Sequence, residues 1–215
     1  MSKSLGNVLS PSDLVTHYGL DQLRYFLLRE VPFGQDGSFS HEQIIRRING
    51  DLANDYGNLA QRILSMIHRN CDGMVPEPHQ CNAEDSALTK AGDELYEKCR
   101  EVIDGNLSFH IALAEIWQVI GAANRYVDSQ APWKLMKTNP KRMKTVLYVV
   151  AELLRKLALL LQPYMPTSTG ALLDQLSVLP ERRTFAHLGP DNALIPLTKL
   201  PKPEGVFPRY SEKEN

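Results

Sequence analysis

The sequence has few cysteines and no long apolar run, and each shortage excludes a class of protein. Its three cysteines, Cys71, Cys81 and Cys99, match neither the CxxC spacing of zinc and redox motifs nor an even-numbered disulfide framework. The longest apolar run, LALLLQPYMP, is interrupted by Pro163 and Pro166 and is shorter than the ~18–20 residues of a membrane span. The N-terminus also lacks the apolar segment of a secretion signal. We therefore expect a cytoplasmic protein with reduced thiols and no membrane segment.

An excess of charge of either sign is also missing. The chain has 24 Lys and Arg against 25 Asp and Glu, a net charge of −1, which gives no global attraction to nucleic acid or membranes. The charges are nevertheless segregated, because residues 72–104 are strongly acidic and residues 132–162 strongly basic. The basic segment is suited to phosphate contacts. The alternative is a helix face of solvated lysines.

Metal-binding patterns are absent as well. The 6 histidines show neither HxxxH nor HExxH spacing, so we expect no metal site.

What the sequence does contain is helical periodicity throughout a chain that is 43% hydrophobic. Strand-like alternation is scarce, so the fold class is mainly α, a helix bundle. Expected helices cover residues 11–18, 20–30, 41–70, 84–104, 109–128, 140–162 and 167–177, with another helical turn starting at Pro132, and the proline-rich residues 179–210 are expected to be extended. The helix starts are predicted from caps at Ser10, Ser40, Ser108 and Asn139.

The helix over residues 41–70 is the longest. Its apolar positions recur every three or four residues and form one buried stripe, made of Ile45, Ile48, Leu52, Tyr56, Leu59, Ile63 and Ile67. Gly50 and Gly57 each weaken the helix by ~1 kcal/mol relative to alanine, so tertiary packing must stabilise it. The segment 140–162 is apolar on most of its circumference and is expected to be the central helix.

A polar stripe borders this apolar one and contains Asp51, Asp55, Asn58, Arg62, Ser65 and Arg69. Asn58 and Arg62 are four residues apart, so their side chains project from the same side of the helix. An amide and a guanidinium suit the exposed edges of unstacked bases. The alternative is a plain polar flank in which Arg62 pairs with Asp55 or Asp51.

Trp133 lies between Ala-Pro and two lysines, Lys134 and Lys137. An indole beside basic side chains is a platform on which a base can stack. The alternative is a core tryptophan, because burial of its large surface is favourable. Trp117, within the apolar pattern LAEIWQVI, is assigned to the core.

Several motifs in order resemble one family. MSKS before LGN resembles the Lys-Met-Ser-Lys-Ser signature of class I aminoacyl-tRNA synthetases without its first lysine. RYFLLREVPFGQDGSFS, NDYGNLAQR, YVDSQAPW and VFPR resemble the methionyl member of that class, over essentially the whole chain. The resemblance implies three parts: residues 1–38, the catalytic loop and connecting helices; 39–180, a helical anticodon-binding bundle; and 181–215, an extended segment that packs back on the protein.

The resemblance also implies roles for individual residues. Lys3, in a flexible loop with Ser2 and Ser4, would close on the phosphates of ATP, where a cation stabilises the charge that grows on pyrophosphate as it leaves. Asn58 and Arg62 match the pair that reads the anticodon CAU. Trp133, together with Pro132, matches the tryptophan that stacks on the first anticodon base.

The function implied is that of a methionine-tRNA ligase, which joins methionine to tRNA(Met) with ATP and Mg²⁺. The sequence lacks a His-Ile-Gly-His signature and a Gly-rich nucleotide loop. We therefore expect a monomeric chain that has no bound cofactor, binds tRNA weakly and is inactive alone.

Three alternatives remain open at this stage. Another class I synthetase, of the valyl or leucyl type, shares the loop signature and a helical anticodon domain. A non-catalytic helical RNA-binding module, or one that binds a protein, predicts a buried Trp133 and unrelated directions for Asn58 and Arg62. A structural interaction module that uses the helix 140–162 requires a large exposed apolar patch.

Overall fold

The computed structural model describes residues 10–37 and 40–211, and these residues are mainly helical. The α-helices are α1 (Pro11–Tyr18), α2 (Leu20–Glu30), α3 (His41–Arg47), α4 (Asn58–Asn70), α5 (Ala83–Asn106), α6 (Phe109–Gln130), α7 (Pro132–Thr138), α8 (Pro140–Leu161) and α9 (Pro166–Gln175). A π-helical segment, Ile48–Gly57, joins α3 to α4. Within the described ranges the only β-type pairing is one isolated bridge between Met74 and Lys199. The mainly α fold is therefore confirmed.

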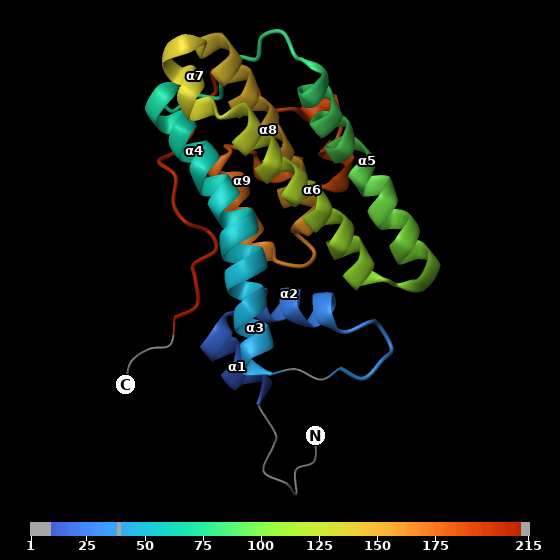
Figure 1. Cartoon of the computed structure of the whole chain (residues 1–215). Coiled ribbons are helices and arrows are strands. Elements are labelled where there is room, and N and C mark those ends of the chain that lie inside the picture. The colour runs from blue at the N-terminus through green and yellow to red at the C-terminus, as the bar shows by residue number, and fades with distance from the viewer. Residues whose placement is uncertain (1–9, 38–39, 212–215) are drawn as a thin grey trace, which may run out of the picture.

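The long helices lie side by side and the short ones gather at the two ends (Figure 1). Helices α1, α2 and α3 lie at one end, and α7 lies at the other, beside the C-terminal end of α4. Helix α8 packs against α4, α5, α6, α7 and α9, and most of its residues are buried. Its predicted central position is confirmed, and an interaction module with an exposed apolar α8 is excluded. No helix in the part of the chain that the structure describes is both long and apolar enough to cross a membrane.

The predicted helix caps are confirmed at two positions. The Ser40 hydroxyl accepts from the Gln43 backbone N–H at 3.3 Å and the Gln43 side chain accepts from the Ser40 N–H at 2.9 Å, a complete capping box. Asn139 Oδ1 accepts from the Arg142 N–H at 3.1 Å. The predictions at Ser10 and Ser108 were correct for the helix start but wrong for the cap, because neither side chain makes a capping hydrogen bond.

The long helix differs from a regular α-helix between Ile48 and Gly57. A π-helical turn includes more residues than an α-helical turn, so residues four apart stay aligned. The buried positions here are Ile44, Ile48, Leu52 and Tyr56, followed by Leu59, Ile63 and Ile67. The prediction that Ile45 belongs to this stripe was wrong. Ile45 is only partly buried, because the wider turns place Ile44 on the core side.

Gly57 allows the C-terminal segment to approach the long helix closely. A Cβ atom at this position would lie 3.0 Å from Phe207 Cβ and 2.9 Å from the Leu52 carbonyl oxygen. Phe207 is buried and its ring packs on Tyr56, with the ring centroids 5.3 Å apart. This contact explains a glycine at a position where helix propensity alone disfavours it.

The segment after α9 is not extended throughout, so that prediction was wrong in part. Three short 3-10 turns, Pro180–Arg182, Phe185–His187 and Pro190–Asn192, shape its first half. Its second half runs alongside α4 (Figure 1), and two amide side chains hold its backbone. Gln175 donates to the Glu204 carbonyl and accepts from its N–H, both at 2.9 Å. Asn49 donates to the Tyr210 carbonyl at 3.2 Å and accepts from its N–H at 2.8 Å.

Candidate functional site

Arg62 and Trp133 line the same cavity, at the end of the bundle where α7 lies beside α4 (Figure 1). The cavity has a volume of about 280 Å³. Its walls come from α4, from the last turns of α6 and from the start of α7, and consist of Gln61, Arg62, Ile63, Ser65, Met66, Arg69, Val127 and Trp133. Two residues that sequence motifs 71 positions apart single out thus meet in one place.

Trp133 is 45% exposed, so the alternative of a core tryptophan was wrong. Its position follows from the end of α6, where Ala131 adopts a left-handed conformation with φ 43° and Pro132 then starts α7. Pro132 itself is buried and does not line the cavity. It therefore fixes the start of α7 and orients Trp133, and in this structure offers no surface of its own to a ligand. Trp117 is partly buried and packs against the core, with its ring centroid 4.6 Å from that of Tyr25.

Among the described residues, the Arg62 guanidinium has a hydrogen-bond partner at one nitrogen only. Its Nη1 donates to Asp128 Oδ1 at 3.2 Å. Its Nε and Nη2 are shielded from water and have no hydrogen-bond partner among the described residues. The alternative that paired Arg62 with Asp51 or Asp55 was wrong, since Asp51 instead accepts from Arg47 at 2.9 Å and from the Tyr25 hydroxyl at 2.7 Å.

Asn58 is exposed at the start of α4, one helical turn before Arg62. It does not line the cavity. The structure thus brings Arg62 and Trp133 together and leaves Asn58 on the adjoining surface of the same helix.

Four residues of the site were missed by sequence reasoning. Gln61 lines the cavity, and its Nε2 donates to the hydroxyl of Ser65, which belongs to the predicted polar stripe, at 3.2 Å. Met66 and Val127 line the cavity too, and Asp128 pairs with Arg62. Val127 and Asp128 belong to the YVDSQAPW motif and Gln61 belongs to NDYGNLAQR, so these motifs were the available signal. Met66 lies in neither motif and in neither stripe.

A buried ion pair supports the elements on either side of α7. Asp85 is fully buried and accepts from Arg142 at 2.5 and 2.7 Å and from the Tyr126 hydroxyl at 2.5 Å. Arg142 also donates to Gln130 at the end of α6. Burial acts to raise the pKa of Asp85, but the hydrogen bonds from Arg142, Tyr126 and Asn82 outweigh it and hold that pKa below its usual value. The end of α6, the start of α8 and the start of α5 are thus fixed together.

The segregated charges therefore have a structural role as well. Arg142 pairs with Asp85 and Lys156 with Asp93, so basic α8 is bound to acidic α5, and Arg155 pairs with Glu152 within α8. Lys134 and Lys137 on α7 are exposed beside Trp133. Only part of the basic segment is thus available to phosphates.

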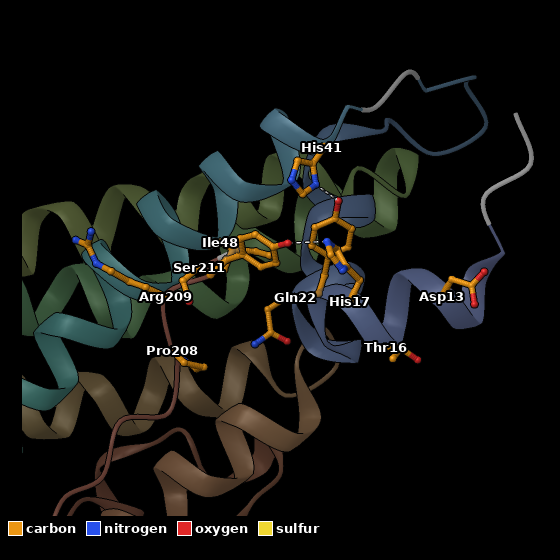
Figure 2. A pocket seen from close by; sticks show the side chains of 11 residues that line it. Asp13, Thr16, His17, Gln22, His41, Ile48, Pro208, Arg209 and Ser211 are labelled. Carbon is orange, nitrogen blue, oxygen red and sulfur yellow. Dashed lines mark hydrogen bonds between the residues drawn. The ribbon is translucent and has the colours of Figure 1, made fainter. Parts of the chain in front are cut away.

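A larger cavity, of about 770 Å³, lies at the opposite end of the bundle (Figure 2). Two histidines and two tyrosines line it and form hydrogen bonds with each other: Tyr210 Oη with His17 Nε2 at 2.6 Å, and Tyr18 Oη with His41 Nδ1. The four rings also pack on one another, with centroids 4.7 to 5.7 Å apart. This cluster joins the C-terminal segment to α1 and α3.

The catalytic residues inferred from the resemblance, Lys3, Ser2 and Ser4, lie outside the described residues. Among the residues that are described, no group of three or more His, Cys, Asp and Glu side chains is arranged to hold a metal ion.

Two family models match this chain, one over its N-terminal part and one over the rest. Residues 1–64 match the family model described as tRNA synthetases class I (M), and residues 75–214 match that of the anticodon binding domain of methionyl tRNA ligase. The methionine-tRNA ligase of Mesorhizobium japonicum is 54% identical over 213 residues, 99% of this chain and 41% of that protein. That of Rhizobium meliloti is 55% identical over 214 residues, with 100% and 41% covered.

A solved structure agrees. Mycobacterium tuberculosis methionyl-tRNA synthetase in complex with methionyl-adenylate superposes with a TM-score of 0.93 at 51% identity, over 97% of this chain and 41% of that one. The chain spans about two fifths of the length of these relatives. Because the anticodon-domain model alone matches well over half of the sequence, the chain belongs to the methionyl-tRNA ligase family.

Proposed function

We propose that this chain supplies the anticodon-binding part of a methionine-tRNA ligase and recognises the CAU anticodon of tRNA(Met). The observation that supports this most strongly is the shared cavity of Arg62 and Trp133, in which a partly exposed indole lies with a guanidinium that has unpaired donors. Family membership excludes the valyl and leucyl alternatives. The exposed Trp133 also argues against the non-catalytic module that predicted its burial.

The chemistry of the cavity suits one unstacked base. The indole face offers stacking, which tolerates any base. The planar guanidinium offers hydrogen bonds to a base edge, and these discriminate between bases. Because Nε and Nη2 of Arg62 are covered in the free chain, a base that reaches them must displace neighbouring side chains. Lys134 and Lys137 are placed to contact the adjoining phosphates. Asn58, one turn away, is available for a neighbouring base.

The activity of the parent enzyme forms the second part of the proposal. The relatives are named methionine-tRNA ligases, and one solved relative holds methionyl-adenylate. The parent enzyme would thus use methionine, ATP and Mg²⁺, with the loop of Lys3 closing on the phosphates, and act as a cytoplasmic monomer. We expect the chain alone to form no methionyl-adenylate, because its sequence lacks the His-Ile-Gly-His signature. Pyrophosphate exchange measures this, and a measurable rate would refute it.

Binding of RNA hairpins tests the anticodon proposal directly. The wild-type chain should bind an anticodon hairpin with CAU more tightly than one with a scrambled loop. Trp133→Ala should weaken CAU binding by ~1–3 kcal/mol, because the stacking surface is lost. Met136→Ala is the matched control: Met136 is 41% exposed on the same short helix but does not line the cavity. Equal affinity of the wild type for both hairpins would defeat the proposal.

A further inference from the structure

Gln61 contributes an unpaired acceptor to the cavity of Arg62 and Trp133. Its Oε1 is shielded from water and has no hydrogen-bond partner among the described residues. Its Nε2 donates to Ser65 Oγ at 3.2 Å, which fixes the orientation of the amide. A buried acceptor left unpaired costs free energy, and a ligand that donates to it would recover that cost.

The two unpaired donors of Arg62 belong to the same wall. One acceptor on Gln61 and a fork of two donors on Arg62 together form a pattern that a base edge can match. On their Watson–Crick edges, cytosine presents an amine beside two acceptors and adenine an amine beside one. Uracil has a carbonyl oxygen in place of cytosine's amine, and guanine one in place of adenine's. An acceptor on the protein therefore favours the amino bases over the keto bases.

We propose that Gln61 is a specificity-determining residue of this site, whose Oε1 accepts a hydrogen bond from the exocyclic amine of the base that stacks on Trp133. The inference rests on the proposed function and adds a chemical criterion to it. Arg62 binds the acceptors of the base, and Gln61 distinguishes an amine from a carbonyl. Ser65 is a positioning residue, since it holds the amide nitrogen and thereby orients the oxygen.

The test compares two synthetic hairpins, with the anticodons CAU and UAU. Their first bases differ by an amine or a carbonyl at C4 and by a lone pair or a hydrogen at N3, so the comparison between variants, and not the preference of the wild type alone, isolates the role of Gln61. Two variants are compared. Gln61→Met keeps the length of the side chain but removes the acceptor oxygen, and Gln61→Glu keeps an acceptor oxygen. We expect Gln61→Met to reduce the preference for CAU over UAU by about ten-fold, the loss of one hydrogen bond to a buried group. Gln61→Glu should keep the preference. Ser65→Ala should reduce it less than Gln61→Met does.

The outcomes separate the two proposals. If the wild type prefers CAU over scrambled hairpins and Gln61→Met keeps the full preference for CAU over UAU, the role of Gln61 is wrong and the proposed function stands. If Gln61→Glu binds CAU more weakly than Gln61→Met does, the amide acts as a donor, and the inference is also wrong. If the wild type shows no preference for CAU over scrambled hairpins, both proposals fall. Thermal unfolding of each variant shows that the fold is retained.

Discussion

The two ends of the bundle each contain a cavity, and they differ in how their polar groups are paired. In the larger cavity the histidines and tyrosines form hydrogen bonds with each other (Figure 2). In the smaller one Gln61 and Arg62 keep donors and acceptors without a partner among the described residues. Paired groups stabilise the fold. Unpaired buried groups instead favour ligand binding, because a ligand that pairs with them lowers the free energy of the complex. Size alone would therefore have pointed to the end of the bundle opposite the candidate site.

The largest effect should come from the buried ion pair of Asp85 and Arg142. Asp85→Ala leaves Arg142 without its carboxylate, and breaking a buried pair costs about 3–5 kcal/mol of unfolding free energy. Asp13→Ala, at the edge of the larger cavity, is the control, because Asp13 is exposed and makes no ion pair among the described residues. Urea denaturation measures the unfolding free energy of both variants. Equal losses would show that the two ends depend on similar support.

The pH dependence of stability sharpens the same point. The pKa of Asp85 is lowered in the folded chain, so its contribution is present above the unfolded-state pKa, about 3.9, and is lost as the pH falls through the folded-state value. The difference in unfolding free energy between the wild type and Asp85→Asn should thus be largest near pH 7 and shrink below about pH 4. A difference that stays constant over this range would contradict the assignment.

Arg62 and Lys137 should have effects of different kinds on RNA binding. Arg62→Ala should cost about 1–3 kcal/mol for a CAU hairpin and little for a scrambled one, because contacts to base edges discriminate between sequences. Lys137→Ala should lower the affinity for both hairpins by the same factor and reduce the salt dependence of that affinity, as expected for a phosphate contact. A salt titration of both variants tests this. Asp128→Asn is a control for the loss of the Arg62 ion pair alone.

The smallest effect should come from the cluster at the opposite end. Tyr210→Phe removes the hydrogen bond to His17 but keeps the ring packing, and should cost no more than about 1 kcal/mol of unfolding free energy. It should leave the affinity for a CAU hairpin unchanged, since the cluster lies at the far end of the bundle (Figure 1). A loss of RNA affinity would show that the two ends are coupled through the C-terminal segment.

Much of the fold was predictable because it depends on local sequence. The capping box at Ser40, the side-chain cap at Asn139 and the apolar stretch of α8 act within a few turns of a helix, so their effect is visible in the sequence. The π-helical segment was not predictable in this way. Its ends contact residues that are distant in sequence: Ile48 packs in a cluster with Phe26, and Gly57 lies close to Phe207.

The candidate site was predictable only in part. Its motifs singled out Arg62 and Trp133. Gln61 lies next to Arg62 in the motif NDYGNLAQR, but it belongs to neither the polar nor the apolar stripe, so periodicity gave no reason to select it. The alternative for Arg62 placed its ion-pair partner on its own helix, but the partner is Asp128 on α6. Pairing across helices depends on their relative placement, which no local pattern contains.

By itself, the sequence determined the family, the mainly α class and the start of most helices. Each of these depends on residues that are close together in the chain or on motifs that are contiguous in the sequence. Only the tertiary structure decided that Trp133 is exposed, that the polar groups of one cavity pair with each other, and that those of the other do not. The physical reason is that exposure and hydrogen-bond pairing are set by neighbours in space, and at both ends of this bundle those neighbours are distant in sequence.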